Sequence, residues 1–180
     1  MPGMPGRPSR PSRRRIGVVL AVLACGGGLA ACGSDAETTY VDGWDDACSD
    51  VGDAVSAFRT AVSSAATDSP DAGDAQAVRG PSPAAVRGDL LEPAVELRRD
   101  LAAVAGEVRA LTPPERWAAW HGREVQQLTL RLRTVDRGVA RLRAGDPDAL
   151  PLLAVGSIGP SSVRAPAGLR DRTPECTVLR

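Results

Sequence analysis

The chain has 180 residues, and its 22 basic residues balance 22 acidic ones, so the formal charge at pH 7 is zero. Every basic residue is arginine, which excludes enzymes that use a lysine nucleophile or a lysine Schiff base. The balanced charge also lacks the excess of basic residues that is typical of nucleic-acid-binding proteins.

The first 31 residues have the organisation of an export signal. Residues 1–15 contain five arginines and no acid, and residues 16–31 form an apolar run. A basic start, a short apolar run and small residues before a cleavage point are typical of signal peptides. A membrane-spanning helix needs roughly 20 apolar residues, so this run is short for a permanent span. We therefore expect residues 1–31 to be a removable leader.

The leader ends in Leu29, Ala30, Ala31 and Cys32, which resemble the lipobox of bacterial lipoproteins at all four positions. The resemblance covers only the leader and Cys32. It implies that Cys32 receives a diacylglyceryl group, becomes the first mature residue and anchors the protein to the extracytoplasmic side of the cell membrane. Several acyl chains give stable anchoring where one is marginal. The alternative is an ordinary signal peptide that leaves Cys32 as a free thiol.

The arginine-only composition, rich in Ala, Gly and Pro, is similar to that of small secreted lipoproteins of actinobacteria. Without the leader, residues 32–180 would form one domain with 17 basic and 22 acidic residues, a formal charge of −5 that argues against nucleic acid as a partner. Besides Cys32 this part retains Cys48 and Cys176. An even pair in an oxidising compartment predicts a disulfide, and two buried free thiols are the alternative.

Residues 32–41 are predicted to be a short polar tether, and the first helix is predicted over residues 42–66. Its apolar residues recur at alternating steps of four and three, which indicates one buried stripe; they are Trp44, Cys48, Val51, Val55, Phe58, Val62 and Ala65. Residues 67–86 are rich in Pro, Gly, Ser and Asp without periodicity, which predicts a flexible loop.

A second helix is predicted over about residues 89–111, with Pro93 near its start because proline is tolerated there. Thr112 and Glu115 form a capping-box pattern with Pro113 between them, so a third helix is predicted from there to about Ala144, ending at Gly145. The short link predicts an antiparallel hairpin. Residues 148–180 are expected to add one or two short helical pieces and an irregular tail.

No convincing strand pattern occurs, so the sequence predicts an all-α fold, an antiparallel bundle of three to four helices over residues 42–180. In an up-down-up bundle the first and third helices start at the same end. Chain topology then brings together the three tryptophans, the only histidine and the expected disulfide: Trp44, Cys48, Trp117, Trp120, His121 and Cys176. This cluster is either a small ligand-binding pocket or, as we prefer, a plug of large side chains that closes the bundle.

No catalytic or metal-binding motif accompanies the cluster. One histidine and a pair of cysteines that we expect to be oxidised do not supply the four ligands of a structural zinc site, and no G-x-S-x-G motif occurs. The arginines of the third helix could contact anionic lipid or an acidic partner, but a solvated face is the simpler interpretation; they are Arg116, Arg123, Arg131, Arg133, Arg137, Arg141 and Arg143.

We therefore expect no enzyme activity, no metal and no cofactor. The function predicted from the sequence is that of a cell-envelope lipoprotein, a scaffold or accessory module with a protein partner in the envelope. The alternative is a small ligand-binding or sensory lipoprotein that uses the aromatic end.

Overall fold

The computed structural model describes residues 32–67, 83–155, 159 and 164–177. The expected leader, and residues 68–82 of the expected loop, lie outside the described residues. The described part is helical throughout its regular elements, which confirms the all-α fold. Its elements in chain order are α1 (Cys32–Thr67), α2 (Pro83–Ala110), α3 (Glu115–Arg143), the 3₁₀ helix η1 (Pro147–Leu153), α4 (Ala167–Arg170) and the 3₁₀ helix η3 (Pro174–Thr177).

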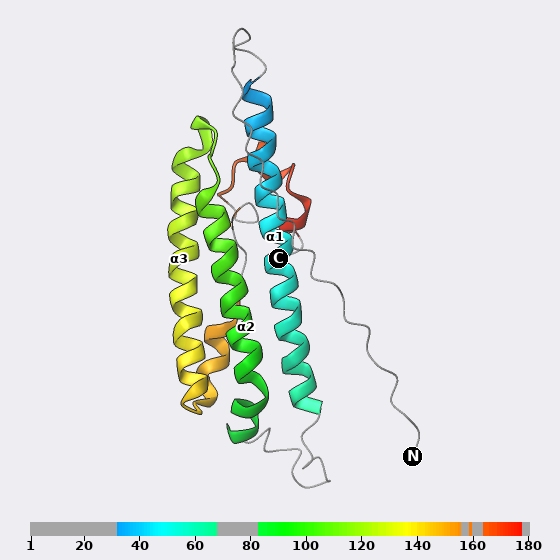
Figure 1. Ribbon diagram of the computed structural model, residues 1–180, viewed down its shortest axis with the longest axis vertical. Helices are drawn as coiled ribbons and strands as arrows, with labels where there is room; N and C mark the ends of the chain where they lie inside the picture. Colours follow the sequence, from blue (N-terminus) through cyan, green and yellow to red (C-terminus); the bar gives the residue numbers. More distant parts are fainter. Residues whose placement is uncertain (1–31, 68–82, 156–158, 160–163, 178–180) are drawn as a thin grey trace, which may run out of the picture.

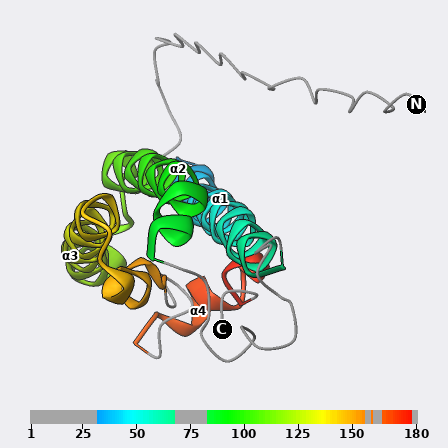
Figure 2. The same cartoon turned by 90° about the horizontal axis from the view of Figure 1, so that it is seen from below.

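In the view of Figure 1, α1 runs downward, α2 runs back upward and α3 runs downward again, so that α1 and α3 are parallel and α2 is antiparallel to both. Seen along the bundle, they form an arc with α2 between α1 and α3, and the C-terminal pieces occupy the open side of the arc (Figure 2). There η1 packs against α3 and η3 packs against α1. The C-terminal segment thus takes the place of a fourth helix and closes the core.

Helix α1 begins at Cys32 rather than near Asp42, so residues 32–41 are helical where we expected a tether. The buried stripe of this helix also starts one turn earlier than predicted. Tyr40 precedes Trp44 by four residues, and both Tyr40 and Val41 are buried. A helix that extends its apolar stripe gains burial for each added turn.

Helix α2 begins at Pro83, so the end of the expected loop is helical as well. Pro93 lies inside this helix and not at its start as predicted. The helix continues through it because Leu90 and Ala94, on either side, are both buried in the core. Their packing outweighs the lost backbone hydrogen bond, which is the usual reason that a proline ends a helix.

The start of α3 also differs from the prediction, whereas its end agrees. The helix begins at Glu115 with Pro114 at the N-cap and without a side-chain cap, so the capping box of Thr112 does not form. At the other end Gly145 has a φ of 78°, a left-handed conformation that favours glycine. Its N–H donates to the Leu142 carbonyl, and the Asp146 N–H donates to the Arg141 carbonyl, the paired bonds of a Schellman motif.

Candidate functional site

The aromatic residues that we expected to converge do so at the end of the bundle where α1 and α3 begin. The ring centroids of Trp44 and Trp120 lie 5.3 Å apart, and those of Trp44 and His121 lie 6.2 Å apart. Trp117 is on the same face of α3, one turn before His121. All four side chains are buried, and the most accessible of them, His121, is only 7% exposed. The cluster is therefore packed and closed, as a plug would be.

Tyr40 belongs to this cluster, although the sequence analysis assigned it to the tether. Its hydroxyl lies 3.1 Å from Nδ1 of His121 in a buried hydrogen bond. Its ring centroid lies 5.7 Å from that of Trp117 and 5.6 Å from that of His121. The spacing of four residues between Tyr40 and Trp44 was the signal that could have revealed it. We call these five residues, Tyr40, Trp44, Trp117, Trp120 and His121, the aromatic cluster.

Burial sets the protonation of the two titratable groups in the cluster. It lowers the pKa of His121 below its ordinary value of 6.5 and raises the pKa of Tyr40 to about 12. Both groups are therefore uncharged near neutral pH. The hydrogen bond between the neutral imidazole of His121 and the neutral phenol of Tyr40 therefore has a structural role in the core.

Two buried polar atoms of the cluster, the indole nitrogens of Trp44 and Trp120, have no partner within hydrogen-bond geometry among the described residues. Each such N–H costs roughly 1–3 kcal/mol relative to its hydrated state. The Trp44 indole nevertheless lies close enough to Tyr40 to oppose the rise in the Tyr40 pKa. The packing is tight on the other side of the Trp44 indole, since a Cβ atom on Gly159 would overlap its six-membered ring. Gly159 also has a φ of 46°, so glycine is required there on two grounds.

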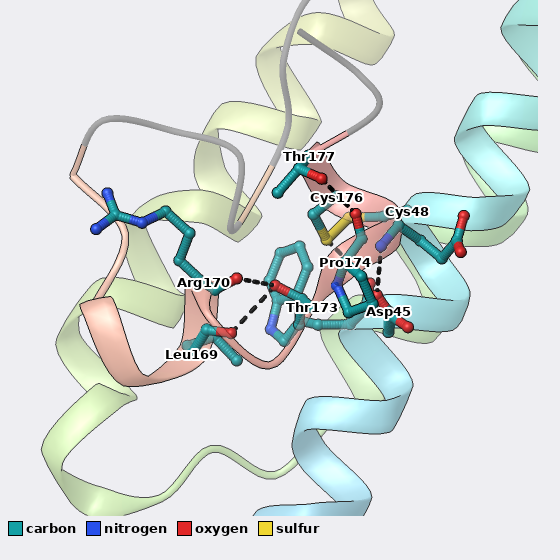
Figure 3. Close-up of a disulfide and its surroundings, with 10 residues drawn as sticks. Asp45, Cys48, Leu169, Arg170, Thr173, Pro174, Cys176 and Thr177 are labelled. Atoms are coloured by element: carbon teal, nitrogen blue, oxygen red, sulfur yellow. Dashed lines mark hydrogen bonds between the residues drawn. A yellow bond between two sulfur atoms is a disulfide. The ribbon is translucent and has the colours of Figure 1, made fainter.

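The expected disulfide is present next to the cluster. Cys48 of α1 and Cys176 of η3 are bonded with a Cα–Cα distance of 4.9 Å (Figure 3). Two hydrogen bonds fix the chain around Cys176. The Glu175 N–H donates to the Asp45 carboxylate at 2.9 Å, and the buried Thr173 hydroxyl donates to the Leu169 carbonyl at 3.1 Å. The end of the C-terminal segment is thus attached to α1 covalently and by polar contacts.

Charged residues surround this end of the bundle in ion pairs. Glu37 of α1 pairs with Arg116 of α3 and, at 2.7 Å, with Arg172 after α4. The Arg116 guanidinium also lies over the Trp117 ring at 4.5 Å from its centroid. Because both arginines are exposed, each pair contributes at most about 1 kcal/mol. They link the first turns of α1 to the start of α3 and to the segment after α4.

The prediction that the charged residues of α3 face solvent is wrong at two positions. Glu124 is buried, and burial raises its pKa, while the charges of Arg131 and Arg123 and a hydrogen bond from the Gly159 backbone oppose that rise. Arg131 is only partly accessible, and burial lowers its pKa. Neither position was singled out by the sequence, because the residues that cover them come from the C-terminal segment, which has no periodicity.

Arg131 lies beside an apolar cavity that the sequence analysis also did not predict. The cavity has a volume of about 150 Å³ and lies between the middle of the three helices and the segment after η1. It is separate from the aromatic cluster. Its lining comprises Val51, Leu101, Val104, Leu128, Arg131, Leu132, Thr134, Val135, Leu152, Ala154 and Val155.

The described residues contain no group of three or more His, Cys, Asp or Glu side chains arranged to hold a metal ion. No helix among them is long and apolar enough to cross a membrane. Comparison of the chain with protein-family models, curated proteins and solved structures finds no match in any of the three.

Proposed function

We propose that this protein is a non-enzymatic cell-envelope lipoprotein, anchored to the membrane through Cys32 and acting as a scaffold or interaction module. The observation that carries the proposal is the lipobox-like Leu29-Ala30-Ala31-Cys32 after a basic and then apolar leader. A lipid on Cys32 would supply the membrane attachment, and the helical domain that follows would supply the surface for a protein partner.

The start of α1 determines how far the aromatic cluster would lie from a lipid on Cys32. Because the helix begins at Cys32, an acylated Cys32 would be the first residue of a helix and not the end of a flexible tether. Tyr40 follows eight residues later, about 12 Å along the helix axis at 1.5 Å per residue. The aromatic end of the bundle would then face the membrane surface at short range.

The packing of the aromatic cluster favours a scaffold over the competing ligand-binding function at that end. A binding pocket needs concave space that a ligand can enter. Trp44, Trp117, Trp120 and His121 are instead buried, and Gly159 packs on the Trp44 ring. Their packing supports a structural role, in which large side chains fill the end of a core that consists mostly of small and aliphatic residues.

The anchor can be tested by metabolic labelling with an alkynyl palmitate in a bacterium that processes lipoproteins. We expect label on the wild type and none on C32S. The matched control is C25S, which changes the other cysteine of the leader region and should keep the label. Label that persists in C32S, or wild type that remains unlabelled, would contradict the proposal.

The scaffold role can be tested by in-cell crosslinking followed by mass spectrometry, comparing wild type with C32S. We expect a defined set of envelope proteins that is crosslinked to the wild type and reduced with C32S, because loss of the anchor removes the protein from the membrane. An enzyme would instead show substrate turnover that H121A abolishes. Turnover of that kind, without crosslinked partners, would refute the scaffold function.

A further inference from the structure

The cavity beside Arg131 has the properties of a small binding site. Most of its lining is apolar, and these side chains come from all three long helices and from the segment after η1. Leu128 and Val135 form its α3 wall, while Leu101 and Val104 form its α2 wall. All four are fixed in the core, since none is more than 9% exposed. The cavity is therefore held open by packed helices.

The volume limits the size of an occupant. An apolar cavity of about 150 Å³ accommodates a benzene-sized molecule. This volume is smaller than the pockets of about 300 Å³ or more that hold drug-sized ligands. Filling it would restore dispersion contacts that the lining side chains otherwise lack.

Arg131 is the one charged side chain among the described residues of the lining, and it determines which charge an occupant can carry. Arg131 takes part in none of the ion pairs found among the described residues, although arginines elsewhere on α3 do. Glu124 favours its charge through space without coming within ion-pair distance. Thr134 is nearby, with its hydroxyl donating to the Leu130 carbonyl. A partly buried cation at the edge of an apolar cavity favours an anion.

We propose that this cavity binds a small carboxylate with a benzene-sized apolar group, such as an arylacetate, with the ring among the core side chains and the carboxylate on Arg131. A guanidinium pairs with a carboxylate through charge-assisted hydrogen bonds, which are stronger than those between neutral groups. The inference is independent of the lipid anchor, because it rests on the cavity and on Arg131 alone.

The test uses four probes that separate the ring from the charge: phenylacetate, 2-phenylethanol, phenethylammonium and acetate. Each is titrated into the full-length protein while the methyl groups of Leu and Val are followed by NMR. We expect phenylacetate to shift the methyl signals of Leu128, Leu132 and Val135. Phenylethanol should bind more weakly, and phenethylammonium and acetate should not bind there.

Two matched variants test the role of the charge. R131Q should weaken phenylacetate binding by about tenfold or more, the loss expected for a charge-assisted hydrogen bond, while changing phenylethanol binding less than about twofold. R133Q removes the same charge from an exposed position two residues away and should leave both affinities unchanged. Equal effects of the two variants on phenylacetate would refute the assignment of the carboxylate to Arg131.

A blocked cavity tests the location. V104F places a ring in the cavity and should abolish the phenylacetate shifts. If circular dichroism shows that V104F does not fold, L132F serves instead, because Leu132 is only partly buried and has space to adjust. Unchanged binding in the folded variant, tighter binding of phenethylammonium than of phenylacetate, or no cavity shifts with phenylacetate at all would overturn the proposal.

Discussion

The disulfide between Cys48 and Cys176 joins positions 128 residues apart, and its removal is the most informative perturbation of stability. In the chain-entropy model, a loop of this length stabilises the fold by about 5 kcal/mol, as an upper estimate. A domain of this size has a total stability of about 5–15 kcal/mol. We therefore expect C48A/C176A to lose about 3–5 kcal/mol, roughly a fifth or more of the total.

The measurement is urea unfolding followed by tryptophan fluorescence, since the tryptophans lie beside the disulfide. The variant should show a lower midpoint and a larger dependence on urea, because its unfolded chain exposes more surface. Wild type that has been unfolded, reduced and refolded should behave like the variant, which separates the crosslink from any effect of the alanine side chains. A loss below about 1 kcal/mol in both samples would refute the entropic reasoning.

Three further predictions concern helix packing and the aromatic cluster. G138A should lower the free energy of unfolding in urea by about 1–2 kcal/mol, because its Cβ would lie 2.8 Å from Leu153. G122A should raise it by up to about 1 kcal/mol, because nothing lies within 4 Å of the added Cβ and alanine favours the helix. Equal effects of the two substitutions would contradict this reasoning. Burial lowers the pKa of His121, so below about pH 6.5 the unfolded chain binds a proton that the folded chain does not, and stability should fall as the pH drops from there to the lower folded pKa. H121Q should flatten this slope below about pH 6.5, and an unchanged slope would exclude His121 as its source. Y40F should cost about 1–3 kcal/mol in the same assay, because it leaves the buried Nδ1 of His121 without its partner, and no loss would show that this hydrogen bond adds nothing.

The periodic parts of the chain could be predicted from the sequence, because a four-three spacing of apolar residues determines both the helix and its buried face. That spacing, with the up-down-up topology, was enough to bring Trp44 to His121. The pairing of Cys48 with Cys176 was predicted on a different ground, because they form an even pair of cysteines after the expected leader and Cys32 are set aside. The burial of Tyr40 was not predicted, because polar neighbours masked the first turn of its apolar stripe. Pro93 was wrongly predicted to lie near the helix start, because packing around it outweighs the local preference of proline.

The C-terminal segment could not be derived in the same way. It has no period, and its path is determined by contacts with distant residues, such as Gly159 against Trp44 and Leu153 against Gly138. The cavity and the burial of Glu124 and Arg131 depend on that path. Nothing local in the sequence of α3 distinguishes Arg131 from the exposed Arg133.

The disulfide also determines what a protease can release. A cut anywhere between residues 48 and 176 leaves the two fragments joined through sulfur, because both cysteines lie outside the nick. If Cys32 carries the proposed lipid, shedding the domain in one step requires cleavage within residues 32–48, which are helical and resist proteolysis until they unfold locally. Retention of a nicked protein at the membrane would then depend on the redox state of its surroundings.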